Sequence, residues 1–213
     1  MNYLAHIFLA RHSEEAMLGA FLGDFVKGDY TGIYSPEIET EISIHRKVDS
    51  YTDTHPVIKS AKQYFGGPRR RFAGIVLDIF YDHMLARHWS SYSAVPIGTF
   101  IEGFYSALSR SDHLLPDPLN RMVPRMIEQD WLGSYQDFSG VEIAVNRVST
   151  RLSRNGDLMR DGLLDLRANY AAIAAGFPAL FAELASFVAR HRAAINDARL
   201  QASADRHTLA EAL

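Results

Sequence analysis

Residues 72–88 form the segment that most constrains the fold, because they are apolar almost without interruption. The apolar residues recur at helical spacing and cover most of the circumference of the helix that this spacing predicts. A helix that is apolar nearly all round belongs inside a protein, where other elements surround it. We therefore expect residues 72–88 to be the central helix of a core.

The rest of the 213-residue chain also carries helical spacing, whereas the period-2 alternation of strands is scarce. Gly176 and Pro178 should interrupt the last helical segment. The expected helices cover one or two segments within 4–25, and then 36–55, 57–65, 72–88, 99–108, 123–129, 139–155 and 163–195. This pattern and length predict an all-α fold, a single-domain helical bundle over residues 1–196, with a frayed tail over 197–213.

Composition excludes several classes of function. The chain has no cysteine, so it has no disulfide, zinc ribbon, iron–sulfur cluster or thiol nucleophile. A formal charge of -3 gives no reason to expect a nucleic acid partner. No apolar run suggests a membrane helix, and no basic segment precedes the N-terminal apolar run as in a signal peptide. We expect a cytoplasmic protein with no membrane or nucleic acid partner.

Acidic residues and a histidine interrupt the buried segment 72–88. Asp78 and Asp82 are four residues apart and share a helix face, and His83 follows directly. Two buried carboxylates repel each other unless a positive group compensates them. Arginines from neighbouring helices could do this, and so could a divalent cation. A structural role, in which each acid caps or pairs with a neighbouring helix, is the alternative.

Other segments carry the same kinds of side chain. His45 and Asp49 are four residues apart, and Asp53 lies one further turn along that face. Asp24 follows an apolar helical segment, and His6 lies in an apolar context, where a histidine is more often part of the core than a ligand. Oxygen and imidazole ligands suit Mn²⁺, Mg²⁺ or Fe²⁺, and a helix-bundle interior can hold them. These patterns indicate an all-α protein with the ligands of a metal-dependent hydrolase.

Four motifs together resemble one known family. The segments "MNYLAH", "LGDFVKG", "IHRKVDSYTD" and "LDIFYDHMLARHW" occur in the order and spacing of the bacterial acyl carrier protein phosphodiesterases. All four lie before residue 90, and the second half of the chain matches only in helical character and length. The ordered set is more specific than any single motif.

The resemblance implies a divergent HD-type metal phosphohydrolase that takes part in fatty acid and lipid metabolism. It implies Mn²⁺-dependent hydrolysis of the phosphodiester between a serine of holo-acyl carrier protein and 4′-phosphopantetheine, with Mg²⁺ or Fe²⁺ as alternative metals. The usual His-Asp doublet is inverted here to Asp82-His83, so only the family's own motifs are carried over. The metal-site candidates are Asp24, His45, Asp78, Asp82 and His83, with His6 as a further one.

Roles follow for these and for nearby basic residues. The catalytic candidates are Asp24 or Asp78, which could orient the attacking water, and His83 or His45, which could protonate the leaving serine. Basic residues beside these motifs could bind phosphate: Lys27, Arg46 and Lys47. An acidic carrier protein needs a local basic surface, and the run before the central helix is our candidate: Arg69, Arg70 and Arg71.

Two other functions fit the same patterns. One is a metal-dependent phosphohydrolase of nucleotides or small phosphodiesters, with an HD-type iron oxygenase as a more distant variant. The other is a non-catalytic helical interaction domain whose buried acids pair with arginines. Activity on holo-carrier protein against a nucleotide panel separates the hydrolases, and metal analysis separates both from the interaction domain.

Overall fold

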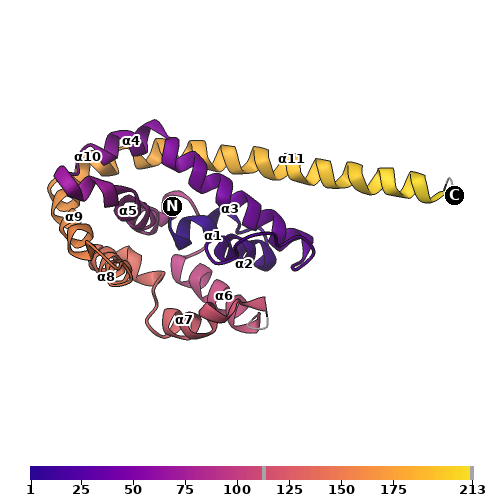
Figure 1. The fold of residues 1–213 in the computed structure, drawn as a ribbon, viewed down its shortest axis with the longest axis horizontal. Coiled ribbons are helices and arrows are strands. Elements are labelled where there is room, and N and C mark those ends of the chain that lie inside the picture. The colour runs from indigo at the N-terminus through magenta and orange to yellow at the C-terminus, as the bar shows by residue number, and fades with distance from the viewer. Residues whose placement is uncertain (112–113, 212–213) are drawn as a thin grey trace.

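The structure is a computed structural model that describes residues 1–111 and 114–211 (Figure 1). The side chains of residue 200 and of residues 203–211 are left out. Helix α5 (Ala73–Arg87) is the buried helix around which other helices pack. Every residue of α5 from Ile79 to Ala86 is buried. Helices α1, α4, α8 and α9 all pack against α5. The described residues contain no strand. The predicted all-α fold with a buried central helix is therefore confirmed.

Short connections join most of the helices, whereas residues 23–35 form a longer loop between α2 and α3. The bounds of the helices are α1 (Tyr3–Leu9), α2 (Glu14–Leu22), α3 (Pro36–Thr54), α4 (Pro56–Lys62), α6 (Ile97–Arg110), α7 (Asp117–Glu128), α8 (Phe138–Ser149), α9 (Gly156–Ala168), α10 (Tyr170–Ala174) and α11 (Phe177–Glu211). Short 3₁₀ helices connect some of them: η1 (Gly67–Phe72), η2 (Trp89–Ser91) and η4 (Gly133–Gln136).

Local sequence signals set several helix ends. The Ser13 hydroxyl accepts a hydrogen bond from the backbone of Ala16 and begins α2. Pro36 and Pro56 occupy the first turns of α3 and α4, where a missing N–H costs nothing. α11 begins at Phe177, so the predicted interruption at Gly176 and Pro178 is confirmed.

Several boundaries differ from the sequence predictions, among them the start of α9, which lies at Gly156 and not at 163. Between the helices expected at 57–65 and 72–88, residues Gly67–Phe72 form the 3₁₀ helix η1. α7 begins at Asp117, six residues before the expected start, because Pro118 suits a first turn. α8 ends at Ser149 and not at Asn155, which instead precedes α9 with a left-handed φ of 61°.

Helices α2 and α3 approach closely because α2 carries a glycine at the contact. A Cβ atom on Gly19 would lie 2.5 Å from the carbonyl oxygen of Ile38 and 2.9 Å from its Cα. Only a residue without a Cβ lets two helix backbones come this near. The contact fixes the position of α3, which carries His45 and Asp49, against α2.

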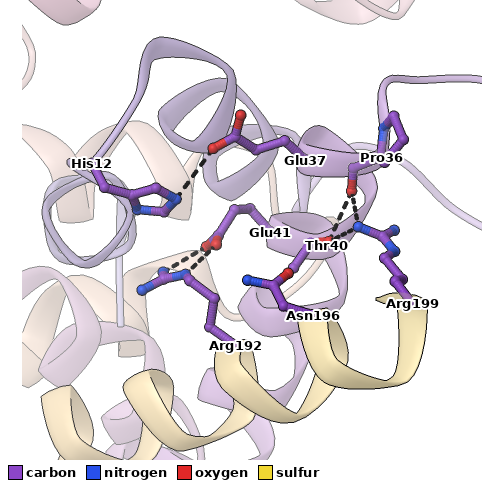
Figure 2. Close-up of a pocket in the computed structure, with 8 residues that line it drawn as sticks. All are labelled: His12, Pro36, Glu37, Thr40, Glu41, Arg192, Asn196 and Arg199. Atoms are coloured by element: carbon purple, nitrogen blue, oxygen red, sulfur yellow. Dashed lines mark hydrogen bonds and ion pairs between the residues drawn. The ribbon is translucent and has the colours of Figure 1, made fainter. Parts of the chain in front are cut away.

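Helix α11 packs along α3 and extends beyond the rest of the molecule (Figure 1). Arg192, which is half-buried, forms an ion pair with the buried Glu41 at 2.5 Å and also donates to the backbone oxygen of Leu9 at 3.1 Å. A cavity of about 520 Å³ lies beside this pair, and its charged groups are already paired, His12 with Glu37 at 3.3 Å among them (Figure 2).

The segment from residue 197, where we expect fraying, continues as helix to Glu211.

One helical stretch corrects the expectation about membrane segments. Tyr170–Arg199 is long and apolar enough to cross a membrane by length and composition, since an 18-residue window within it has a mean hydropathy of 1.7. In the structure its apolar face packs into the core at helical spacing, through Ile173, Phe177, Leu180, Leu184 and Val188. The core helix of a globular protein passes the same composition test, so this stretch alone does not imply a membrane partner.

Gly19→Ala should lower the free energy of unfolding by about 1–3 kcal/mol, because the added methyl group forces the two helix backbones apart. Gly103→Ala on α6 is the matched control, since a Cβ there meets no atom within 4 Å. That control should leave stability unchanged or raise it by up to about 1 kcal/mol. Urea unfolding of both variants measures the difference, and equal stabilities would contradict the close contact.

Candidate metal centre

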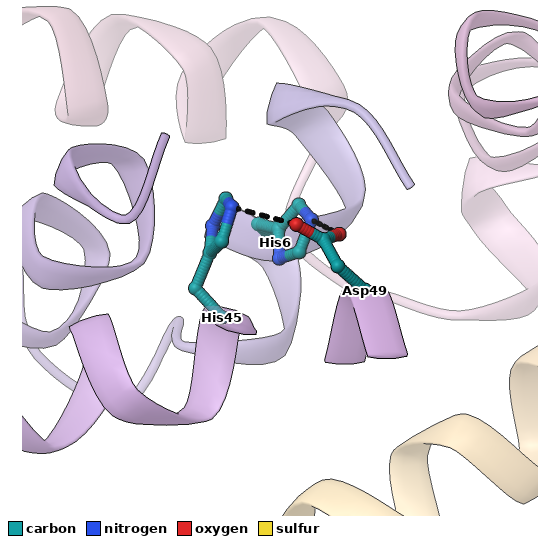
Figure 3. Close-up of side chains that lie close together, drawn as sticks. All are labelled: His6, His45 and Asp49. Carbon is teal, nitrogen blue, oxygen red and sulfur yellow. Dashed lines mark hydrogen bonds and ion pairs between the residues drawn. The ribbon is translucent and has the colours of Figure 1, made fainter. Parts of the chain in front are cut away.

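Two histidines and one aspartate meet where α1 approaches α3 (Figure 3). The rings of His6 and His45 are stacked, with centroids 3.7 Å apart and planes 16° apart. Asp49 lies across both rings, with Oδ1 3.1 Å from His6 Nε2 and Oδ2 3.2 Å from His45 Nε2. Both rings are buried. The structure thus brings a residue from α1 together with two from α3.

Helix α2 orients the ring of His45. A Cβ atom on Gly23 would lie 2.2 Å from His45 Cγ, so the ring packs directly on the glycine backbone. His45 Nδ1 lies 2.6 Å from the carbonyl oxygen of Ala20. Because a carbonyl only accepts, Nδ1 carries the hydrogen and donates it. His45 Nε2 therefore faces the opposite way, toward Asp49 and toward Asp24, whose Oδ1 is 3.4 Å distant.

The Nε2 atom of His45 lacks a well-directed hydrogen bond. It is buried and makes none to either carboxylate, although both lie within ion-pair distance. In a neutral ring with hydrogen on Nδ1, Nε2 would direct its lone pair at two negative groups. A bound proton or a cation between them removes this repulsion. One ligand atom each from His6, His45 and Asp49 lie within 4.8 Å of one another, so the donor set fits a divalent cation.

The charges of the centre are coupled. Burial alone would lower the pKa of His45, but Asp24 and Asp49 outweigh it and raise the pKa to about 9. Burial and the stacked His45 lower the pKa of His6 to about 4. Burial would raise the pKa of Asp49, but the two neighbouring histidines, His45 and His6, hold it well below its usual range. At neutral pH, and without a bound cation, His45 is therefore protonated, His6 is neutral and Asp49 is ionised.

Asp78 belongs to the cavity beside the histidine pair. The cavity has a volume of about 240 Å³, and its lining includes Asp24, Asp49, Asp53 and Asp78. The amino group of Met1 donates to Asp78 Oδ1 at 2.9 Å and lies 3.7 Å from Asp49 Oδ1. Burial raises the pKa of Asp78, although the Met1 amino group opposes this. No arginine pairs with these acids among the described residues.

Asp82 and His83 lie apart from this cavity. Asp82 is fully buried and accepts hydrogen bonds from the backbone nitrogens of Leu4 at 2.7 Å and Ala5 at 3.1 Å. It thus caps the first turn of α1. His83 Nδ1 donates to the carbonyl oxygen of Tyr135 at 2.7 Å, and Nε2 accepts from the Tyr170 hydroxyl at 2.9 Å. The structure therefore does not bring these two candidates together with the others.

The predicted phosphate-binding residues lie on the surface near Asp24. Arg46 donates to the carbonyl oxygen of Val26 at 2.9 Å, and its guanidinium lies 4.7 Å from the ring centre of Tyr30. It therefore holds the loop that follows Asp24. Lys27 and Lys47 are exposed.

The predicted docking residues before α5 are engaged within the molecule. Arg69 makes two hydrogen bonds to Asp165, at 2.7 and 3.0 Å. Arg70 Nε donates to the carbonyl oxygen of Phe65 at 3.0 Å, and Arg71 lies over the ring of Phe72 at 5.0 Å.

Asp49 is the residue that the candidate set from the resemblance lacks. The spacing of His45 and Asp49 already places both on one face of α3, and Asp49 lies closest to both rings. The signal that could have found it was present, because an i, i+4 histidine–aspartate pair on a buried face is a common ligand arrangement. 

Comparison with known proteins places the chain in a family. The family model described as acyl carrier protein phosphodiesterase matches residues 1–184. The chain belongs to this family. A relative of that name from Pectobacterium atrosepticum is 36% identical over 152 residues, covering 71% of this chain and 79% of the relative. One from Escherichia coli O157:H7 is 34% identical over 181 residues, covering 83% and 92%. No solved structure matches.

Asp82→Asn should lower the free energy of unfolding of the chelator-treated protein by about 1–3 kcal/mol, because an amide nitrogen would replace one of the two accepting oxygens. Asp197→Asn, an exposed change on α11, is the control and should stay within about 0.5 kcal/mol of wild type. Urea unfolding with chelator measures both. A metal-ligand role for Asp82 would instead leave the chelated protein's stability unchanged.

Asp49→Asn should lower the titration midpoint of His45 from about 9 toward its ordinary 6.5, because one of the two carboxylates that raise it is lost. A histidine pKa raised by folding stabilises the folded state fully below pH 6.5, and this contribution is lost as the pH rises through about 9. The variant should therefore be destabilised more at pH 6 than at pH 10. Ring-proton NMR and urea unfolding of chelated protein measure this, and an unchanged midpoint would contradict it.

Proposed function

We propose that this protein is a metal-dependent phosphodiesterase that hydrolyses the bond between serine and 4′-phosphopantetheine in holo-acyl carrier protein. The products are apo-carrier protein and 4′-phosphopantetheine. Family membership supports the activity. The buried, unpartnered Nε2 of His45, aimed at two carboxylates, is the observation that supports metal dependence.

The ligands that fit a cation come from three elements. His45 and Asp49 of α3, His6 of α1 and Asp24 after α2 present nitrogen and oxygen atoms toward one centre. This donor set suits Mn²⁺, with Mg²⁺ or Fe²⁺ as alternatives. His6 Nε2 lies 3.1 Å from both Met1 O and Asp49 Oδ1, so it carries a hydrogen that it donates to them. To hold a cation through Nε2, His6 would have to lose this hydrogen. When bound, such an ion neutralises phosphate charge and lowers the pKa of a water.

Asp78 is the group that can move a proton in this cavity. Its pKa is raised by burial, which brings a carboxylate closer to the range of a general base at neutral pH. It shares the cavity with Asp24, Asp49 and Asp53. His83 does not reach this cavity, because both its ring nitrogens are bonded to Tyr135 and Tyr170. We therefore assign to Asp78 the role of accepting the proton of the attacking water.

The size of the cavity favours a phosphodiester carried on the surface of another molecule. At about 240 Å³ it is smaller than the roughly 300–1,000 Å³ of sites that enclose a small ligand. A nucleotide would not be enclosed, whereas a phosphate on a protein needs only its own atoms to enter. This observation favours the carrier protein over the nucleotide alternative.

Holo-carrier protein incubated with the enzyme and Mn²⁺ should lose the mass of phosphopantetheine, and a chelator should prevent the loss. Mass spectrometry of the carrier protein measures this. Loss that is unaffected by chelator would contradict metal dependence. No loss under any metal, together with turnover of a nucleotide panel, would contradict the substrate.

Asp49→Asn should reduce the rate of this hydrolysis by at least about 100-fold. Loss of a residue that only hydrogen-bonds to a metal ligand costs up to about 100-fold, and loss of a ligand itself should cost no less. Cation content of the purified variant should fall with it, because Asp49 contacts both histidines. Asp197→Asn is the matched control and should keep wild-type rate and metal content. A variant with full metal content and full rate would show that Asp49 is not a ligand.

A further inference from the structure

A further cavity, lined by four arginines, lies at the C-terminal end of α8. Its volume is about 370 Å³. Arg121 and Arg125 are four residues apart on α7. Arg147 lies in the last turn of α8, and Arg151 follows two residues after the end of that helix. These four residues are called the arginine cluster below. Arg121, Arg125 and Arg151 are exposed, and Arg147 is half-buried.

The arginine cluster has no acidic partner. Among the described residues none of the four arginines forms an ion pair. Arg147 instead lies over the ring of Trp131 at 3.6 Å. By contrast, Arg69 of the run before α5 is bonded twice to Asp165. Four uncompensated guanidinium groups repel one another, so an anionic surface placed against them gains free energy.

The arginine cluster adjoins the metal centre. Val148 lines the acidic cavity that contains Asp24 and Asp78, whereas Arg147, its neighbour on α8, lines the arginine cavity. Burial and Asp24 raise the pKa of the Tyr3 hydroxyl to about 12, whereas Arg151 opposes this rise, so charges of both cavities act on one side chain. A molecule seated on the arginines thus places its nearest groups at the acidic cavity.

We propose that the arginine cluster is the surface on which the carrier protein docks, an acidic helical protein that presents its phosphodiester to the acidic cavity. This inference rests on the proposed function. A phosphodiester attached to a protein requires that protein to lie against the surface beside the centre. Guanidinium groups match carboxylates in a bidentate geometry, and Pro118 and Met122 of the same cavity add apolar contact.

A nucleic acid fits this surface less well than an acidic protein. Single-stranded nucleic acids need aromatic rings on which bases stack. Trp131 is the aromatic residue of the cavity lining, and Arg147 covers its ring. No stacking surface is therefore left among the lining residues, while the guanidinium groups remain exposed for carboxylates.

The test reverses two charges on each of two surfaces. Arg121→Glu with Arg125→Glu changes the cluster at its distal side, where both side chains are exposed and touch no residue of the metal centre. Arg70→Glu with Arg71→Glu makes the same charge change at η1, the docking surface expected from the sequence, so the pair of variants decides between the two surfaces. Binding of holo-carrier protein is measured directly by fluorescence anisotropy, alongside KM, kcat, melting temperature and metal content.

The cluster variant should weaken carrier binding and raise KM by about 10-fold or more, with kcat, metal content and melting temperature near those of wild type. The wild-type affinity should fall with added salt, and the variant should lose most of this dependence. The η1 variant should bind as wild type does.

Three results would overturn the inference: unchanged affinity in the cluster variant, equal losses in both variants, or a loss confined to the η1 variant. Binding of an oligonucleotide that depends on the cluster, without carrier binding, would overturn it in favour of nucleic acid. Failure of the proposed function looks different, because wild-type enzyme would then release no phosphopantetheine whether or not the carrier binds.

Discussion

The close packing of α2 on α3 is the constraint on which the centre depends. A side chain at Gly23 would occupy the position of the His45 ring, and one at Gly19 would meet the backbone of α3. With both glycines present, the Ala20 carbonyl oxygen accepts from His45 Nδ1 and leaves Nε2 facing the carboxylates. The same contact that stabilises the fold therefore also selects the imidazole tautomer that can bind a cation.

The buried acid of α5 completes this arrangement from the other side. Asp82 bonds the first turn of α1, and α1 carries His6 onto His45. Asp78, one turn earlier on α5, reaches the cavity itself. One helix thus uses two carboxylates differently: the deeper one positions a neighbouring helix, and the shallower one faces the space where a substrate phosphate would lie.

The sequence predicted what depends on local spacing and missed what depends on tertiary contact. The i, i+4 pair His45 and Asp49 was readable, because one helix face holds both. The adjacency of Asp82 and His83 was misleading, since neighbours on a helix point about 100° apart and these two reach different elements. Which acid faces a cavity and which caps a helix depends on where α1 lies, and no pattern within α5 encodes that.

Under the proposed docking, the two cavities beside α8 would account for how a protein with a formal charge of -3 receives an acidic substrate. A phosphodiester that approaches Asp24, Asp49 and Asp78 is repelled until a cation compensates them. The uncompensated arginines of α7 and α8 attract the substrate's own acidic groups instead. In the proposed docking, binding and chemistry would draw on separate charges: the arginines would hold the protein, and the metal-ligand candidates would act only on the phosphate that this docking places within reach.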